Sequence, residues 1–266
     1  MEWTTEAEEA VKKVPFFVRK KVRARVEKEA LAENKKQITL KEVEKTRKRF
    51  LSNMSSEVKG YQIDTCFGTG GACPNRAVDG DGLLKRLEDL LKKEDILGFL
   101  KQHVKGDLKF HHDFRVTLAD CPNACSQPQI KDIGIIGACF PEITNEGCTL
   151  CRACVDVCAE DAVTLDDENE KPVIDFDRCL ACKKCIVKCP TGTLAEGIKG
   201  FRVMLGGKLG RHPVLAQEIE GLFSEDEVVE IVKNCIRFYK KNSQNGKRFA
   251  QIVQGEDLNV VCGLTG

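Results

Sequence analysis

Two short cysteine-rich stretches, 148-CTLCRACVDVC-158 and 179-CLACKKCIVKCP-190, set the organisation of this chain. Each stretch carries four cysteines with the spacing C-x2-C-x2-C-x3-C, and both copies lie within 43 residues. A [4Fe-4S] cubane needs four soft thiolate ligands, and a tight turn of small residues allows three of them to come from one loop. The sequence therefore predicts two iron-sulfur sites in this region.

This spacing resembles that of bacterial two-cluster ferredoxins, in which the fourth cysteine of each run ligates the cluster of the other run. The resemblance implies one cluster bound by Cys148, Cys151, Cys154 and Cys189, and a second bound by Cys179, Cys182, Cys185 and Cys158. The alternatives are a structural zinc pair or a disulfide framework. Zinc usually takes two separated C-x2-C pairs or a mixture of cysteine and histidine, so the spacing favours clusters.

The composition narrows the functional classes. Fifteen cysteines stand beside one Trp and two Tyr, and the N-terminus, MEWTTEAEEAVKK, has no apolar signal segment, so reduced metal-binding thiols in a cytoplasmic protein are expected. No run of 18 apolar residues predicts a membrane span, and a net charge of +1 gives no general attraction for nucleic acid. Oxygen-sensitive clusters indicate an anaerobic setting. Cys139, Cys235 and Cys262 match no motif and are expected to be structural or free thiols.

The first 54 residues are charge-dense and predict a small helical bundle. Apolar residues recur at three- and four-residue steps, Pro15 separates a short first helix from a longer one, and Thr39 with Glu42 forms a capping box that opens a third. The pattern around Trp3 and VPFFVR resembles the small C-terminal domain of the B subunit of light-independent protochlorophyllide reductase. That resemblance implies a tetrapyrrole setting. The basic residues of the bundle are either a solvated face or a binding surface for an acidic partner.

A second group of cysteines lies in YQIDTCFGTGGACPNRAVDGDG and DCPNACSQPQIKDIGIIG, between residues 61 and 137. The latter segment resembles the siroheme and [4Fe-4S] segment of sulfite and nitrite reductases. The resemblance implies a third cluster on Cys66, Cys73, Cys121 and Cys125, with Cys125 also ligating siroheme iron. Six residues separate Cys66 from Cys73 where the family has five, and the glycine run 68–71 can absorb the extra residue.

The sequence on either side of the double-cysteine region completes the predicted organisation. Residues 83–105 read as one amphipathic helix, residues 107–118 as a strand carrying His111 and His112 on opposite faces, and residues 130–138 as a second strand. The peptide GGKLGRHP, within residues 201–213, resembles a sequence that follows the ferredoxin insert in dissimilatory-type sulfite reductases. Ser224 with Glu227 predicts the capped start of a further helix. The domains expected are 1–54, helical; 58–141 with 198–255, reductase-type; 142–197, an inserted ferredoxin of two short hairpins; and 256–266, a tail.

The fold class expected is α+β, with a helical N-terminal bundle, a sulfite-reductase-type mixed sheet with helices, and an inserted two-cluster ferredoxin domain. Siroheme carries eight carboxylates, so basic side chains on the motif-bearing loops are candidate ligands for its edge, or for an oxyanion. Any one of them is as readily explained as a solvated surface charge. The candidate catalytic residues are Cys125, Arg76, Arg115 and Lys131, and the candidate cofactor-binding residues are Arg76, Asn123, Lys131, Lys208 and Arg211.

Three functions are compatible with these residues. The first is a siroheme and [4Fe-4S] oxidoreductase that reduces sulfite or nitrite with electrons from a donor protein or reductase subunit. The second is an electron-transfer polyferredoxin without catalysis, since the half-domain that precedes the first cysteine pair in the larger reductases is replaced here by the helical residues 1–54. The third makes residues 1–54 a docking module for a tetrapyrrole enzyme. A homo-oligomer is one way of completing the substrate pocket.

Overall fold

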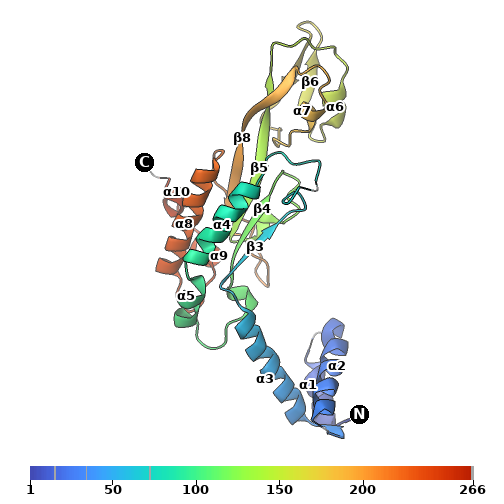
Figure 1. Ribbon diagram of the computed structural model, residues 1–266, viewed down its shortest axis with the longest axis vertical. Helices are drawn as coiled ribbons and strands as arrows, with labels where there is room; N and C mark the ends of the chain where they lie inside the picture. Colours follow the sequence, from blue (N-terminus) through green and yellow to red (C-terminus); the bar gives the residue numbers. More distant parts are fainter. Residues whose placement is uncertain (15, 34, 72, 265–266) are drawn as a thin grey trace. The chain divides into compact units, whose positions relative to one another are not determined.

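The computed structural model of the protein describes residues 1–14, 16–33, 35–71 and 73–264, without the side chains of residues 16–18 and 50–56. Pro15 lies outside this description. The chain divides into two compact units, one formed by Met1–Val58 with Val104–His111 and the other by Lys59–His103 with His112–Gly266. Helices and strands are mixed in the chain, which confirms the predicted α+β class (Figure 1).

The first unit is built on three helices and one pair of very short parallel strands. Its elements are β1 (Glu2–Trp3), α1 (Thr5–Lys12), α2 (Phe16–Ala32), β2 (Gln37–Ile38) and α3 (Leu40–Glu57). Thr39 begins α3 with the predicted capping box, because its side chain and that of Glu42 bond each other's backbone N–H groups. The core contains residues of the predicted apolar stripe, among them Ala7, Val11 and Val26.

The second unit is organised on a five-stranded sheet with the order β3-β4-β5-β8-β9. The strands are β3 (Tyr61–Thr65), β4 (Phe114–Ala119), β5 (Ile133–Ile143), β8 (Leu194–Leu205) and β9 (Gln217–Glu218). β3, β4 and β5 run parallel, whereas β8 is antiparallel to both β5 and β9. Because β3 and β4 are parallel neighbours, their carboxyl ends meet at one edge of the sheet.

Two sequence expectations for residues 83–118 are wrong. Residues 83–105 form two helices, α4 (Asp81–Lys93) and α5 (Ile96–His103), because Asp95 takes a left-handed backbone and its carboxylate accepts the Gly98 N–H. Phe110–His112 forms a 3-10 turn, so the two histidines do not alternate on a strand. The buried Asp113 carboxylate accepts the Gly60 N–H at 2.9 Å, and β4 begins only at the next residue.

The cysteine lobe, defined as residues 144–193, lies between the last paired residue of β5 and the first of β8. It contains α6 (Ala153–Val157), α7 (Lys184–Lys188) and one antiparallel hairpin of β6 (Val163–Asp166) and β7 (Lys171–Ile174), where two hairpins were expected. The two ends of the lobe adjoin, since the Thr144 N–H donates to the Thr193 carbonyl at 2.8 Å. Figure 1 shows the long β5 and β8 ribbons leading from the sheet into this lobe.

The helices that follow the sheet pack on its other elements. These helices are α8 (Glu225–Asn242), α9 (Phe249–Ile252) and α10 (Leu258–Cys262). Earlier in the chain, a second 3-10 turn, Pro128–Ile130, precedes β5. Ser224 and Glu227 form the predicted capping box of α8. α10, in the segment predicted as a tail, packs on α8, where Cys235 and Cys262 are both buried. Across the described residues, no helix is both long and apolar enough to cross a bilayer.

Candidate iron-sulfur sites

The two cysteine runs of the lobe adopt the same backbone geometry. Leu150 and Arg152 in the first run, and Ala181 and Lys183 in the second, all have positive φ angles between 54° and 66°. Such left-handed conformations are unusual for residues with a side chain and persist only where the surrounding structure over-determines them. Here each one flanks a cysteine. The first two cysteines of each run therefore lie in a repeated turn, and the third lies in the first turn of α6 or α7.

Backbone N–H groups point at several cysteine sulfurs of the lobe. In each run the N–H group two residues after the first cysteine donates to that cysteine's sulfur: Leu150 to Cys148 Sγ at 3.4 Å and Ala181 to Cys179 Sγ at 3.4 Å. N–H groups also reach the fourth cysteine of each run, since Ala162 donates to Cys158 Sγ and Leu194 to Cys189 Sγ. Donors aimed at sulfur stabilise an anionic thiolate and tune the potential of a cluster bound to it.

The lobe cysteines are divided between two cavities. The smaller cavity is lined by Cys148, Cys151, Cys154 and Cys189, together with Leu165 and Pro172 of the β6–β7 hairpin. Although burial opposes the thiolate at Cys189, hydrogen bonds from the Leu194 N–H and from Thr191 lower its pKa to about 7. The structure thus brings together the first three cysteines of one run and the fourth of the other.

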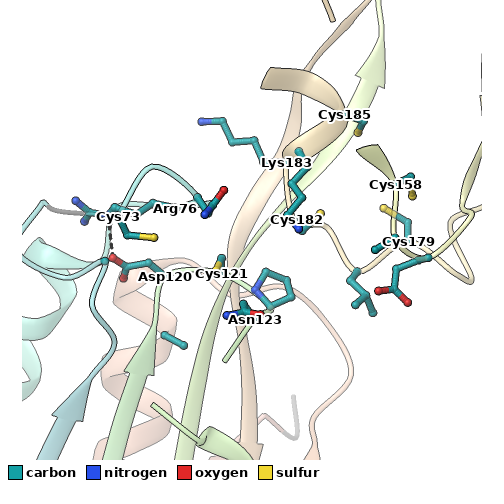
Figure 2. Close-up of a pocket in the computed structure, with 18 of the residues that line it drawn as sticks. Cys73, Arg76, Asp120, Cys121, Asn123, Cys158, Cys179, Cys182, Lys183 and Cys185 are labelled. Carbon is teal, nitrogen blue, oxygen red and sulfur yellow. Dashed lines mark ion pairs between the residues drawn. The ribbon is translucent and has the colours of Figure 1, made fainter. Parts of the chain in front are cut away.

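The larger cavity has a volume of ≈430 Å³ and is lined by eight cysteines. Four belong to the lobe and four to the segments that follow β3 and β4: Cys158, Cys179, Cys182, Cys185, Cys66, Cys73, Cys121 and Cys125. Figure 2 shows Cys73 towards one end of this cavity, Cys185 towards the other, and Cys121 and Cys182 between them. Burial raises the pKa of Cys185 to about 12, so the protein alone disfavours its thiolate form.

The lobe is fixed to the sheet beside this cavity. The N–H of Cys139, a buried residue of β5, donates to the Ala181 carbonyl at 2.8 Å, and Cys139 forms an isolated parallel bridge with Cys182. Lys183, which lines the cavity, pairs with Glu196 of β8. In the described ranges no three His, Cys, Asp or Glu side chains meet closely enough to share a single metal ion. The sulfurs surround cavities instead.

The loop from Cys66 to Cys73 accommodates its extra residue through glycine. Gly70 and Gly71 have φ angles of 91° and 99°, and the Gly71 N–H closes a turn onto the Gly68 carbonyl at 2.9 Å. Cys66 Sγ accepts the N–H groups of Gly68 and Asp120, both at 3.3 Å. Phe67, beside Cys66, is 83% exposed at the rim of the cavity.

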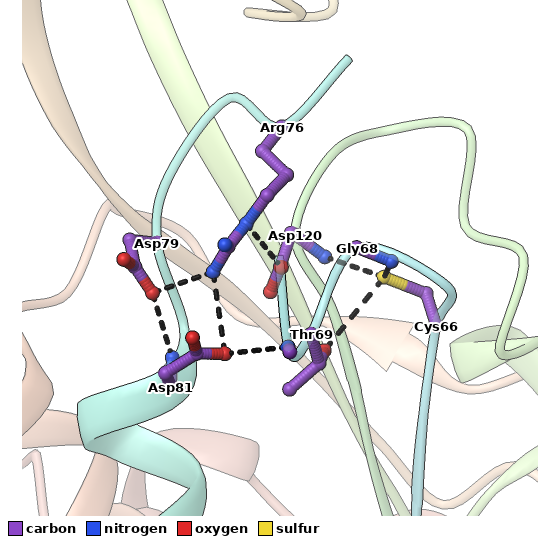
Figure 3. Close-up of polar contacts among 8 residues, drawn as sticks. Cys66, Gly68, Thr69, Arg76, Asp79, Asp81 and Asp120 are labelled. Atoms are coloured by element: carbon purple, nitrogen blue, oxygen red, sulfur yellow. Dashed lines mark hydrogen bonds and ion pairs between the residues drawn. The ribbon is translucent and has the colours of Figure 1, made fainter. Parts of the chain in front are cut away.

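Arg76 lines the cavity but is surrounded by carboxylates. Its Nε lies 2.8 Å from Asp120 Oδ2, and its Nη2 lies 2.5 Å from Asp79 Oδ1 and 3.3 Å from Asp81 Oδ1 (Figure 3). Burial opposes the charge on Arg76, but the three carboxylates outweigh it and raise its pKa. Sequence reasoning missed all three aspartates. The one available signal was that Asp120 directly precedes Cys121.

The remaining predicted site residues divide into two groups. Asn123 lines the cavity, and its Nδ2 donates to the sulfur of Cys125, an exposed residue, at 2.9 Å. Lys131 pairs with Asp64 of β3. Lys208 bridges to Val214 through backbone hydrogen bonds, and Arg211 is exposed. The residues that line the cysteine cavity do not include Arg115, Lys131, Lys208 or Arg211.

The fold and the grouped cysteines define an iron-sulfur protein in which a cysteine-rich lobe is joined to a sheet-based domain. The family model for the nitrite and sulphite reductase 4Fe-4S domain matches residues 61–259, so the chain belongs to that family. The model for the proto-chlorophyllide reductase 57 kD subunit matches residues 3–47. Both of the predicted resemblances are thereby confirmed.

Curated relatives and a solved structure agree with this membership. The coenzyme F420-dependent sulfite reductase of Methanocaldococcus jannaschii is 30% identical over 67% of this chain and 26% of its own length. The beta subunit of the dissimilatory-type sulfite reductase of Archaeoglobus fulgidus is 26% identical over 79% of this chain and 59% of its own. The crystal structure of dissimilatory sulfite reductase I shares the fold, with a TM-score of 0.53 at 15% identity over 81% of this chain and 57% of that one. The chain therefore spans between about a quarter and three fifths of these relatives.

Proposed function

We propose that this chain is an iron-sulfur oxidoreductase of the sulfite or nitrite reductase type that carries electrons through three [4Fe-4S] clusters. The observation that carries the proposal is the ≈430 Å³ cavity lined by eight cysteines, four from the lobe and four from the sheet domain. The smaller cavity is lined by the other four motif cysteines, so each of the twelve motif cysteines lines one of the two cavities.

The cavities suggest an order for the relay. Cys148, Cys151, Cys154 and Cys189 form the entry site, because their cavity is separate from the other eight cysteines. The quartet of Cys158, Cys179, Cys182 and Cys185 comes second, since it shares its cavity with the quartet after β3 and β4. When bound, each cluster accepts and releases single electrons. The protein's part is to hold the quartets close together and to aim N–H groups at their sulfurs.

The residues fit clusters better than they fit siroheme. Cys125 is exposed, as a thiolate that also meets a tetrapyrrole iron must be. The predicted cations, however, do not gather around it: Arg76 contacts three carboxylates, Lys131 pairs with Asp64, and Arg211 is exposed outside the cavity. We infer that a second polypeptide, or a second copy of this chain, supplies the rest of any siroheme and substrate pocket.

A second candidate is an electron carrier that retains the cluster scaffold of a reductase without its catalysis. The contacts of Arg76 and Lys131 favour it, because cations that already bond carboxylates are poorly placed to attract sulfite or nitrite. In either case the partner is a protein that donates electrons at the entry site or receives them beyond Cys125.

One experiment separates the two candidates. Protein expressed anaerobically with siroheme supplied is analysed for iron and sulfide and by absorption spectroscopy, then reduced and mixed with sulfite or nitrite. About twelve cluster irons with tetrapyrrole bands and reoxidation by either anion supports the reductase. About twelve irons without bands or reoxidation supports the carrier for this chain by itself, because a reductase would then need the second polypeptide in order to bind siroheme. About eight irons refutes a cluster at Cys66, Cys73, Cys121 and Cys125.

A further inference from the structure

The four cysteines after β3 and β4 come from separate segments that must be held together. Cys66 and Cys73 lie at the two ends of a glycine-rich loop, whereas Cys121 and Cys125 follow the neighbouring strand. Backbone hydrogen bonds join these segments on either side of the loop. The Cys66 N–H donates to the Leu118 carbonyl at 3.1 Å, and the Ala77 and Val78 N–H groups donate to the Asp120 carbonyl at 2.9 and 3.1 Å. A loop with three glycines between positions 68 and 71 has little intrinsic rigidity.

A closed polar circuit adds contacts that reach into the glycine-rich loop itself (Figure 3). The Asp120 N–H donates to Cys66 Sγ, and the Asp120 carboxylate contacts Arg76 Nε. Arg76 Nη2 contacts Asp81 Oδ1, which also accepts the Gly70 N–H at 2.9 Å from within the cysteine loop. The circuit therefore runs from the strand end that carries Cys121, through Arg76, to the first residue of α4, and back into the loop.

The buried end of this circuit, at Asp120, makes Arg76 hard to replace. The Asp120 side chain is 1% exposed and that of Arg76 is 18% exposed. Removing one partner of a buried ion pair leaves an uncompensated charge, so the segments on both sides must rearrange. Gly68 and Gly80 admit the pair, since a Cβ on either residue would lie 2.9 Å or 2.6 Å from an Asp120 carboxylate oxygen.

We propose that Arg76 is a positioning residue that holds the Cys66–Cys73 loop against Cys121 and so fixes the geometry of the third cluster. This inference rests on the proposed function, because it assumes that the quartet binds a cluster. It replaces the expectation that Arg76 binds a tetrapyrrole or substrate: two of its three guanidinium nitrogens contact carboxylates of this chain.

The test compares Arg76→Gln, Arg76→Lys and Asp120→Asn with the wild-type chain, all purified anaerobically. The matched control is Arg86→Gln, since Arg86 also contacts two carboxylates, Glu225 and Asp226, but is 41% exposed and does not line the cavity. Iron release to a chelator is followed, with electron paramagnetic resonance of the reduced protein separating the third cluster from the two lobe clusters. Replacing a residue that orients metal ligands typically weakens the site by about 10–100-fold.

The expected result is third-cluster iron loss about 10–100-fold faster in Arg76→Gln and Asp120→Asn, with no further loss when both are combined. Arg86→Gln and the lobe clusters should not change. Arg76→Gln should also lower the third cluster's potential, because a positive charge is removed, whereas Arg76→Lys should keep the potential and still lose iron faster. The lobe clusters report folding in each variant.

Two results would count against different claims. A wild-type chain without the third cluster refutes the proposed function. A wild-type chain with three clusters and an Arg76→Gln variant with equal iron retention and potential overturns the positioning role alone. In that case weakened sulfite or siroheme binding in the variant would identify Arg76 as an anion ligand.

Discussion

Replacing Gly137 of β5 with alanine should damage the proposed third cluster through the backbone of Asp120. An added Cβ would lie 2.7 Å from the Asp120 carbonyl oxygen, 3.0 Å from its carbonyl carbon and 3.2 Å from Val78 Cβ. Ordinary contact begins at 3.4 Å, so the backbone of Asp120 must move by about 0.7 Å. That movement displaces the N–H that donates to Cys66 Sγ, directly before Cys121.

The size of the effect follows from the packing. Overpacking a close-packed interior costs about 1–3 kcal/mol. At about 2–4 °C per kcal/mol for a chain of this size, the thermal midpoint should fall by about 2–12 °C at a fixed anaerobic scan rate. Third-cluster iron should be released faster than in the wild-type chain, because the Asp120 N–H donates to Cys66 Sγ, while the lobe clusters should keep their spectra.

Gly200→Ala is the matched control for Gly137→Ala. Gly200 lies on β8, its pairing partner Ala138 is next to Gly137, and its added Cβ would also meet a carbonyl oxygen at 2.7 Å, that of Phe223. The two variants should lose similar stability, but only Gly137→Ala should lose cluster iron. Equal stability loss with an intact third cluster in both would refute the link through Asp120, and unchanged midpoints in both would refute the steric argument.

Three further predictions concern other parts of the second unit. Cys189→Ser should remove about four irons, those of the smaller cavity, and leave the eight-cysteine cavity loaded; a loss of signal from the Cys179 site instead would contradict the grouping of the quartets. Leu87→Ala should lower the free energy of unfolding, measured with a chemical denaturant, by about 2–5 kcal/mol because Leu87 is fully buried. Leu84 is half-buried, so Leu84→Ala should cost less, and equal losses in the two variants would contradict the burial pattern. Hydrogen bonds from the Ser224 backbone and side chain lower the pKa of Glu227. The stability that Glu227 contributes is therefore complete above pH 4.5 and is lost as the pH falls through the lower pKa of the folded state. Glu227→Gln should make the thermal midpoint less dependent on pH in that acid range.

Local signals in the sequence predicted local structure well. The capping boxes at Thr39 and Ser224 involve residues three apart, so the sequence alone contains both partners. The repeated spacing of the cysteine runs likewise determines how three sulfurs can share a turn. The break between α4 and α5 escaped prediction because the leucine periodicity continues through it, while the left-handed Asp95 interrupts the backbone.

The environment of the charged site residues could not be predicted in the same way. Arg76 and Lys131 were chosen because they stand on motif-bearing loops, but the structure pairs them with Asp120 and Asp64. Lys131 and Asp64 are 67 residues apart in the chain. Such pairing depends on strand order and register, which the hydrophobic pattern of one sequence does not specify. The predicted metal-ligand sets and domain boundaries stay predictions for the experiments above.

The hydrogen bond between Thr144 and Thr193 brings the two ends of the cysteine lobe together at the end of the β5–β8 ladder. A segment whose two ends adjoin can be replaced in evolution by another segment without changing the course of the two strands that it connects. A short turn in its place would close β5 and β8 into an ordinary hairpin, and another redox module with adjoining ends would fit the same opening. The electron supply that we propose for this lobe is in this sense a replaceable segment, and its evolution need not follow that of the sheet.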